Sequence, residues 1–63
     1  MKKRDLIRTL NQMASDKGVS FSLRRQGGGH EVWNFGTKTL IIPRHTEIAE
    51  GTARAIVRGA EEA

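Results

Sequence analysis

Residues 30–42 read HEVWNFGTKTLII, and this stretch decides the fold of the chain. Its first half, His30–Phe35, predicts a strand, and the pair Gly36-Thr37 predicts a tight turn. Residues 38–42 predict a second strand that returns beside the first. Pro43 has no backbone N–H to donate, so this second strand should end there or lie at an edge of the sheet.

The residues before this hairpin predict one more strand. Val19, Phe21 and Leu23 alternate with polar residues, which is typical of a strand with one buried face. Gly27-Gly28-Gly29 ends that strand and leads into His30. Because all the connections are short, we expect three antiparallel strands arranged as a meander.

Apolar residues at helical spacing occur both before and after the predicted strands in the sequence. Residues 3–15 predict an amphipathic helix, with Asp5 in its first turn and Gly18 placed to end it. A second helix should start near Gly51-Thr52 and carry two exposed arginines, Arg54 and Arg58, one turn apart. Its apolar residues have the i, i+3, i+4, i+7 spacing of a buried helix face, and they are Ala53, Ile56, Val57 and Ala60.

These elements predict an α+β fold in the order α-β-β-β-α, a single domain of residues 1–63. Both helices should cover one face of the three-stranded antiparallel sheet. A chain of 63 residues without cysteine has a thin core and no disulfide to reinforce it. A deep substrate cavity does not fit in such a domain, so any active site should be a shallow surface feature that acts on a large substrate.

Positive charge is concentrated in the middle of the chain. The net charge is +4, and residues 17–46 hold five basic residues against one acidic residue, Glu31. A polyanion is the natural partner for this distribution, although a basic composition also keeps a small protein in solution. The longest apolar run, residues 40–42, is far too short to span a membrane, and no signal peptide is recognisable. We therefore expect a soluble cytoplasmic protein.

Few side chains offer chemistry. There is no cysteine to act as a thiolate nucleophile, and two histidines without nearby acidic ligands argue against a zinc site. The three glycines at 27–29 join two strands and lack the Gly-Lys-Ser/Thr ending of a P-loop. Glu47 and Glu50 lie among positive neighbours, which predicts ordinary solvated ion pairs. We expect neither a metal nor a cofactor.

His30 is the residue best placed for catalysis. It opens a strand directly after three glycines, so a substrate can approach it with no side chain in the way. The cations on either side of the hairpin, Arg24, Arg25 and Lys38, favour the neutral imidazole that a general base requires. RNA matches such a base, because its 2′-hydroxyl attacks the adjacent phosphate once deprotonated. The alternative is a histidine that only satisfies hydrogen bonds at a strand end.

Three other side chains have more than one interpretation. His45 follows Pro43 and Arg44 in a predicted turn, where it binds phosphate, transfers a second proton or is an ordinary surface residue. Trp33 and Phe35 share one face of their strand, opposite His30. They are able to stack on RNA bases, but burial under the helices is the stronger expectation because few other large side chains are available for a core.

Three segments occur together in an order that one protein family shares. The first is Lys3-Arg4-Asp5-Leu6-Ile7, and the second is Gly28-Gly29-His30-Glu31-Val32-Trp33. The third and most specific is Ile42-Pro43-Arg44-His45, followed by Glu47-Ile48 and Gly51-Thr52-Ala53-Arg54-Ala55-Ile56. Over nearly the whole chain these segments resemble HicA toxins, the mRNA interferases of bacterial toxin–antitoxin modules.

This resemblance implies a double-stranded-RNA-binding-like fold and cleavage of mRNA without the ribosome. It also implies inhibition by a HicB-type antitoxin, with the chain a monomer when free and part of a hetero-oligomer when inhibited. His30 aligns with the catalytic histidine of the family. Gly29 stands where the family usually has serine, and Ala53 stands where leucine is common.

The leading hypothesis from the sequence is a metal-independent endoribonuclease with His30 as its catalytic residue and with Gly28 and Gly29 shaping the site. The side chains expected to hold RNA are Arg24, Arg25, Lys38, Arg44 and His45. One alternative is a non-catalytic RNA-binding module of the same fold. Another is an interaction protein whose open sheet face holds a protein partner.

Overall fold

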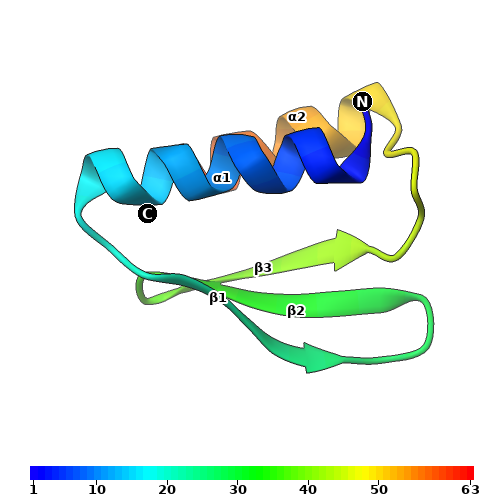
Figure 1. Ribbon diagram of the computed structural model, residues 1–63, viewed down its shortest axis with the longest axis horizontal. Helices are drawn as coiled ribbons and strands as arrows, with labels where there is room; N and C mark the ends of the chain where they lie inside the picture. The colour runs from blue at the N-terminus through cyan, green and yellow to red at the C-terminus, as the bar shows by residue number, and fades with distance from the viewer.

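Five elements follow one another in the expected order in the computed structural model, which describes residues 1–63 (Figure 1). They are α1 (Lys3–Lys17), β1 (Phe21–Gln26), β2 (His30–Phe35), β3 (Lys38–Pro43) and α2 (Glu50–Glu61). The strands form one antiparallel sheet in the order β1-β2-β3, so β2 is central. The helices pack against each other over one face of the sheet and leave the other face open (Figure 1). The α+β class and the α-β-β-β-α order are confirmed.

The first helix ends at the predicted glycine. Gly18 takes the left-handed conformation with φ 71°, and its N–H bonds to the carbonyl of Ser15. The N–H of Val19 bonds to the carbonyl of Ala14, and the two bonds together form a Schellman motif that satisfies the last carbonyls of α1.

Neither α1 nor α2 is long and apolar enough to cross a membrane.

The N-terminal segment is bonded to the loop between β3 and α2. The N–H of Lys3 donates to the carbonyl of Thr46 at 2.8 Å, and the N–H of Ile48 donates to the carbonyl of Met1 at 2.7 Å. The Met1 amine lies 3.1 Å from Glu47, and its hydrogen bond holds the pKa of that carboxyl below its ordinary value. These contacts bring the start of α1 to the end of the sheet where β2 begins (Figure 1).

The core lies between the sheet and the helices. Ten apolar side chains form one buried cluster, and they are Leu6, Leu10, Ala14, Phe35, Leu40, Ile42, Ile48, Ala53, Ile56 and Ala60. The predicted inward face of α2 is confirmed, with Val57 half-buried at its margin. The core is thus built from few residues, as expected for a chain of this length.

The prediction of a buried face on β1 is wrong. Within β1 only Phe21 is half-buried, whereas Leu23 is 41% exposed. Val19 precedes the strand and is 38% exposed. The reason is that β1 is an edge strand: the strand residues of the core cluster all come from β2 and β3, and within β1 only Phe21 packs against that cluster.

One extra residue interrupts the pairing of β1 with β2. Leu23 lies opposite Trp33 and Arg25 lies opposite Val32, so Arg24 has no partner and forms a β-bulge. Strict alternation would place Arg25 on the helix-covered face together with Leu23. The bulge instead places Arg25 on the open face, because directly opposed residues share a face of the sheet.

The predicted turn between β2 and β3 is confirmed, and it requires glycine. Gly36 has φ 60°, a conformation that side chains with a Cβ rarely adopt. A Cβ added there would lie 3.3 Å from the Cβ of Val19. The N–H of Gly36 also donates to the carbonyl of Ser20 at 2.8 Å, so the turn holds the start of β1 in place.

Candidate functional site

His30 is the first residue of the central strand, and its side chain lies on the open face of the sheet. Its neighbour Glu31 contacts Lys3 of α1 and therefore faces the helices. Because side chains alternate along a strand, His30 points to the opposite face. It is exposed, and Pro43 lies opposite it in the register with β3. A large substrate thus has direct access to the imidazole.

The three glycines before His30 place no side chains of their own beside it. They connect β1 to β2 as predicted, and the N–H of Gly27 donates to the carbonyl of His30 at 2.9 Å. A Cβ added at Gly28 or Gly29 would meet nothing within 4 Å, and neither residue has a positive φ. Glycine at these two positions therefore leaves open space beside His30 and is not required by the backbone conformation.

Arg44 binds the glycine loop at several points. Its Nη1 donates to the carbonyl oxygens of Gly27 and Gly28, at 3.1 and 3.3 Å. Its backbone N–H donates to the carbonyl oxygen of Gly29 at 3.0 Å. The predicted RNA-binding residue Arg44 is therefore brought to the His30 end of the sheet, where it also holds the loop.

The open face beside His30 combines a cation with an apolar patch. Val32, two residues after His30, lies opposite Arg25 on one side and Ile41 on the other. Val32 is buried although it is outside the core cluster, and Ile41 is 51% exposed. Arg24 and Arg25 are both exposed at the bulge next to this patch. The structure thus brings both predicted arginines near His30.

Lys38 does not join this site, so the expectation that it flanks His30 is wrong. It pairs with Phe35 at the far end of β2, five residues from His30, a separation of about 16 Å along the strand. It also lies on the helix side, where its Cε is 3.9 Å from the position of a Cβ at Gly59 of α2. The turn between β2 and β3 places it at the opposite end of the hairpin from the triglycine loop.

His45 is exposed in the loop between β3 and α2. It is two residues after Pro43, hence within about 7 Å of it along the chain. Since Pro43 lies opposite His30, both histidines are at the same end of the sheet. No hydrogen bond or ion pair joins His45 to the His30 site.

Trp33 and Phe35 face the helices, and not the open face. Phe35 is fully buried, as expected, and Trp33 is half-buried. The Trp33 ring stacks on Phe21 with centroids 4.6 Å apart and planes at 16°. Its Nε1–H donates to Glu31 at 3.0 Å. Neither ring is available to stack on bases at the His30 face, and the structural interpretation is the correct one.

Glu31 is a buried carboxylate with several polar contacts, and its role was not predicted from the sequence. Its residue surface is only 6% exposed, and its Oε1 lies 2.7 Å from the Nζ of Lys3. Burial acts to raise the pKa of Glu31, but hydrogen bonds from Lys3 and Trp33 and the charge of Arg44 bring it below its ordinary value. The signal was present in the alternation, because Glu31 shares the face of two aromatic residues that were expected to be buried.

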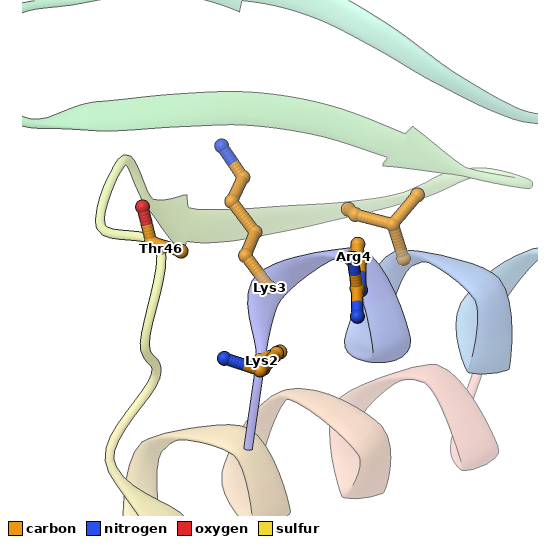
Figure 2. Close-up of a pocket in the computed structure, with 5 residues that line it drawn as sticks. Lys2, Lys3, Arg4 and Thr46 are labelled. Carbon is orange, nitrogen blue, oxygen red and sulfur yellow. The ribbon is translucent and has the colours of Figure 1, made fainter.

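An open hollow lies on the helix side of the same end of the molecule (Figure 2). Its volume is about 530 Å³, and it is lined by Lys2, Lys3, Arg4, Ile7 and Thr46. Figure 2 shows Lys3 extending from the start of α1 toward the sheet. Each cation has a carboxylate partner: Lys2–Glu47 at 3.7 Å, Lys3–Glu31 at 2.7 Å and Arg4–Asp5 at 4.0 Å. The hollow is therefore largely balanced in charge, in contrast to the open face.

The arrangement at His30 suits proton transfer to or from a large anionic molecule. An exposed imidazole stands at a strand end, Arg25 lies on the same face, and the adjacent loop of three glycines carries no side chains. No group of three side chains among His, Asp and Glu comes together in a geometry that would hold a metal ion. The exposed imidazole of His30 offers acid–base chemistry at this end of the sheet.

Comparisons of the chain with protein-family models, with curated protein sequences and with solved structures find no match. The likeness to HicA toxins therefore rests on the three sequence segments that carry it, the first at Lys3–Ile7, the second around His30 and the third from Ile42 onward. The geometry of the His30 end and these segments are together the basis for inferring a function.

Proposed function

We propose that this chain is an endoribonuclease of the HicA toxin type, in which His30 is the catalytic residue. The observation that carries the proposal is the position of His30 on the open face, next to a loop without side chains and to Arg25 and Arg44. The three HicA-like segments support the same conclusion. They align His30 with the catalytic histidine of the family, and His30 is the histidine exposed at this site.

The chemistry is transesterification within the RNA. The neutral imidazole of His30 takes the proton of a 2′-hydroxyl, and the 2′-oxygen attacks the adjacent phosphorus. A bond from the 2′-oxygen to phosphorus forms and the bond from phosphorus to the 5′-oxygen breaks, which leaves a 2′,3′-cyclic phosphate. The imidazolium, or water, then supplies the proton to the departing 5′-oxygen. Neither a metal nor a cofactor takes part.

RNA fits this surface better than a small anion or a neutral substrate. The site is an exposed strand end without an enclosed cavity, which suits a polymer. The one acidic residue in the middle of the chain, Glu31, is buried on the opposite face and paired with Lys3. Arg25 on the open face and Arg24 at the adjacent bulge are exposed and have no carboxylate partner, so they hold phosphates of the bound strand.

The proposal includes a protein partner that inhibits the chain. A chain that cleaves mRNA in the cytoplasm needs an inhibitor, and a HicB-type antitoxin that covers the open face would supply it. Ile41, 51% exposed beside Val32, gives such a partner an apolar contact next to His30. Acidic residues on the partner would speed its encounter with the arginines of this face.

The deciding experiment compares cleavage of an RNA oligonucleotide with that of its 2′-O-methyl analogue, in the presence of EDTA. The wild-type chain should cut only the RNA and leave a 2′,3′-cyclic phosphate. His30→Ala should lower the rate by about 10²–10⁴-fold, and the matched variant His45→Ala should lower it less. Circular dichroism confirms that both variants are folded. Cleavage by folded His30→Ala at the wild-type rate would refute the proposal, and binding without cleavage by the wild type would indicate a non-catalytic RNA-binding module.

A further inference from the structure

Arg44 makes three hydrogen bonds to three consecutive carbonyls of the loop before His30. The guanidinium donates to the carbonyls of Gly27 and Gly28, and the backbone N–H donates to the carbonyl of Gly29. Every backbone acceptor of the triglycine loop is thus bonded to one residue of the neighbouring strand end. This concentration of contacts on a single arginine exceeds what a phosphate-binding residue requires.

The loop has little else to hold it. Glycine has the largest conformational freedom of any residue, and three in succession lose the most entropy when ordered. Gly28 and Gly29 have no side chains to pack, and their missing Cβ positions have no neighbours within 4 Å. Apart from the N–H of Gly27 bonding to the carbonyl of His30, the contacts that fix the loop come from Arg44.

The carbonyls of this loop also matter for the electrostatics of the site. Three carbonyl oxygens next to His30 present partial negative charge where a phosphate has to approach. The guanidinium of Arg44 covers two of them and carries a full positive charge. A planar guanidinium bonds two acceptors at fixed positions, whereas a lysine ammonium acts as a compact point charge.

We infer that Arg44 is a positioning residue for the proposed cleavage reaction, which fastens the triglycine loop and thereby fixes the His30 imidazole against the RNA. The inference rests on the proposed function. Its effect is expected mainly in the chemical step, because small displacements of a catalytic group cost up to about 10²-fold in rate. A residue that only held phosphate would act mainly on RNA affinity.

The test uses Arg44→Ala, Arg44→Lys and a control, Arg58→Ala, which removes an exposed arginine from α2. The backbone bond from residue 44 to Gly29 remains in all of them, so the strand pairing is preserved. Arg44→Ala should lower kcat by about 10-fold or more and increase amide hydrogen exchange at Gly27, whose N–H bonds to the carbonyl of His30. Arg44→Lys should keep the KM for RNA near the wild-type value but should not restore kcat. Arg58→Ala should change neither kcat nor the exchange.

Two results would overturn the inference. One is recovery of kcat by Arg44→Lys, and the other is Arg44→Ala with unchanged amide exchange and unchanged NMR shifts of the His30 ring. The exchange and ring shifts are measured without RNA, so they decide the role of Arg44 in the loop even if the chain proves not to cleave. Absence of cleavage by the wild type would instead refute the proposed function.

Discussion

The Nζ of Lys3 and the Oε1 of Glu31 lie 2.7 Å apart, joining the first turn of α1 to the second residue of the central strand. Their side chains are only 21% and 8% exposed. The Nε1–H of Trp33 donates to the same carboxylate at 3.0 Å. Because Glu31 follows His30 directly, this pair anchors the strand that carries the imidazole, from the face opposite to it.

Glu31→Gln should destabilise the fold by about 1–3 kcal/mol, because it leaves the ammonium of Lys3 poorly compensated where water is largely excluded. Urea unfolding followed by circular dichroism measures the loss. The matched control is Glu50→Gln, whose pair with Arg54 is exposed and 3.6 Å long. That pair should contribute less than about 1 kcal/mol. Equal losses in the two variants would contradict a special role for Glu31.

Acid should destabilise the chain through Glu31. The pKa of Glu31 in the fold is below its ordinary value of 4.5, so the folded state favours the charged carboxylate. The resulting stability is fully present above about pH 4.5 and is lost as the pH falls through the lower, folded pKa. Urea midpoints between pH 7 and pH 3 should fall less steeply for Glu31→Gln than for the wild type. The control Glu62→Gln, at the exposed end of the chain, should follow the wild-type curve.

Arg25 and Lys38 should differ in their effect on RNA binding, although each substitution by alanine removes one positive charge. Arg25 lies on the open face near His30, and Lys38 lies at the other end on the helix side. In a His30→Ala background, which avoids cleavage, Arg25→Ala should reduce the slope of log K against log salt by about 1. Lys38→Ala should leave it unchanged. A larger effect from Lys38 would show that RNA does not bind to the open face.

Substitution by serine should leave stability almost unchanged at Gly29 and reduce it at Gly36. Gly29 has no positive φ and no neighbour within 4 Å of a Cβ, so Gly29→Ser should change stability by less than about 0.5 kcal/mol. HicA toxins usually have serine there, and cleavage should be retained or increased. Gly36→Ser should cost at least about 1 kcal/mol, because φ is 60° and Val19 lies too close. Loss of cleavage in a stable Gly29→Ser variant would show instead that the substrate needs the space at this position.

The order of elements was predictable because each one has a local signal. Alternation located β2 at His30–Phe35, glycine located the Gly36 turn, and helical spacing located both helices to within two residues. The position of His30 on the open face also follows from alternation. Local patterns of this kind depend only on residues that are close in the sequence, so one sequence is enough to detect them.

The features that escaped prediction depend on contacts between distant residues. Alternation alone would place Arg25 on the helix-covered face, but the unpaired residue Arg24 turns it to the open face. The partner of Glu31 is Lys3, 28 positions earlier in the numbering, and periodicity does not select it among 11 basic residues. The hydrogen bonds of Arg44 end on backbone carbonyls, which every residue has, so no motif marks them.

The bulge at Arg24 has a consequence for contacts between copies of the chain. A three-stranded sheet has two exposed edges, and unpaired edges invite other chains to add strands and aggregate. On the β1 edge, the extra residue disrupts the regular spacing of free N–H and C=O groups and adds two adjacent positive charges. On the β3 edge, Pro43 provides no N–H at the last position of the strand. The irregularity that turns Arg25 toward the open face therefore also protects this small sheet from edge-to-edge polymerisation.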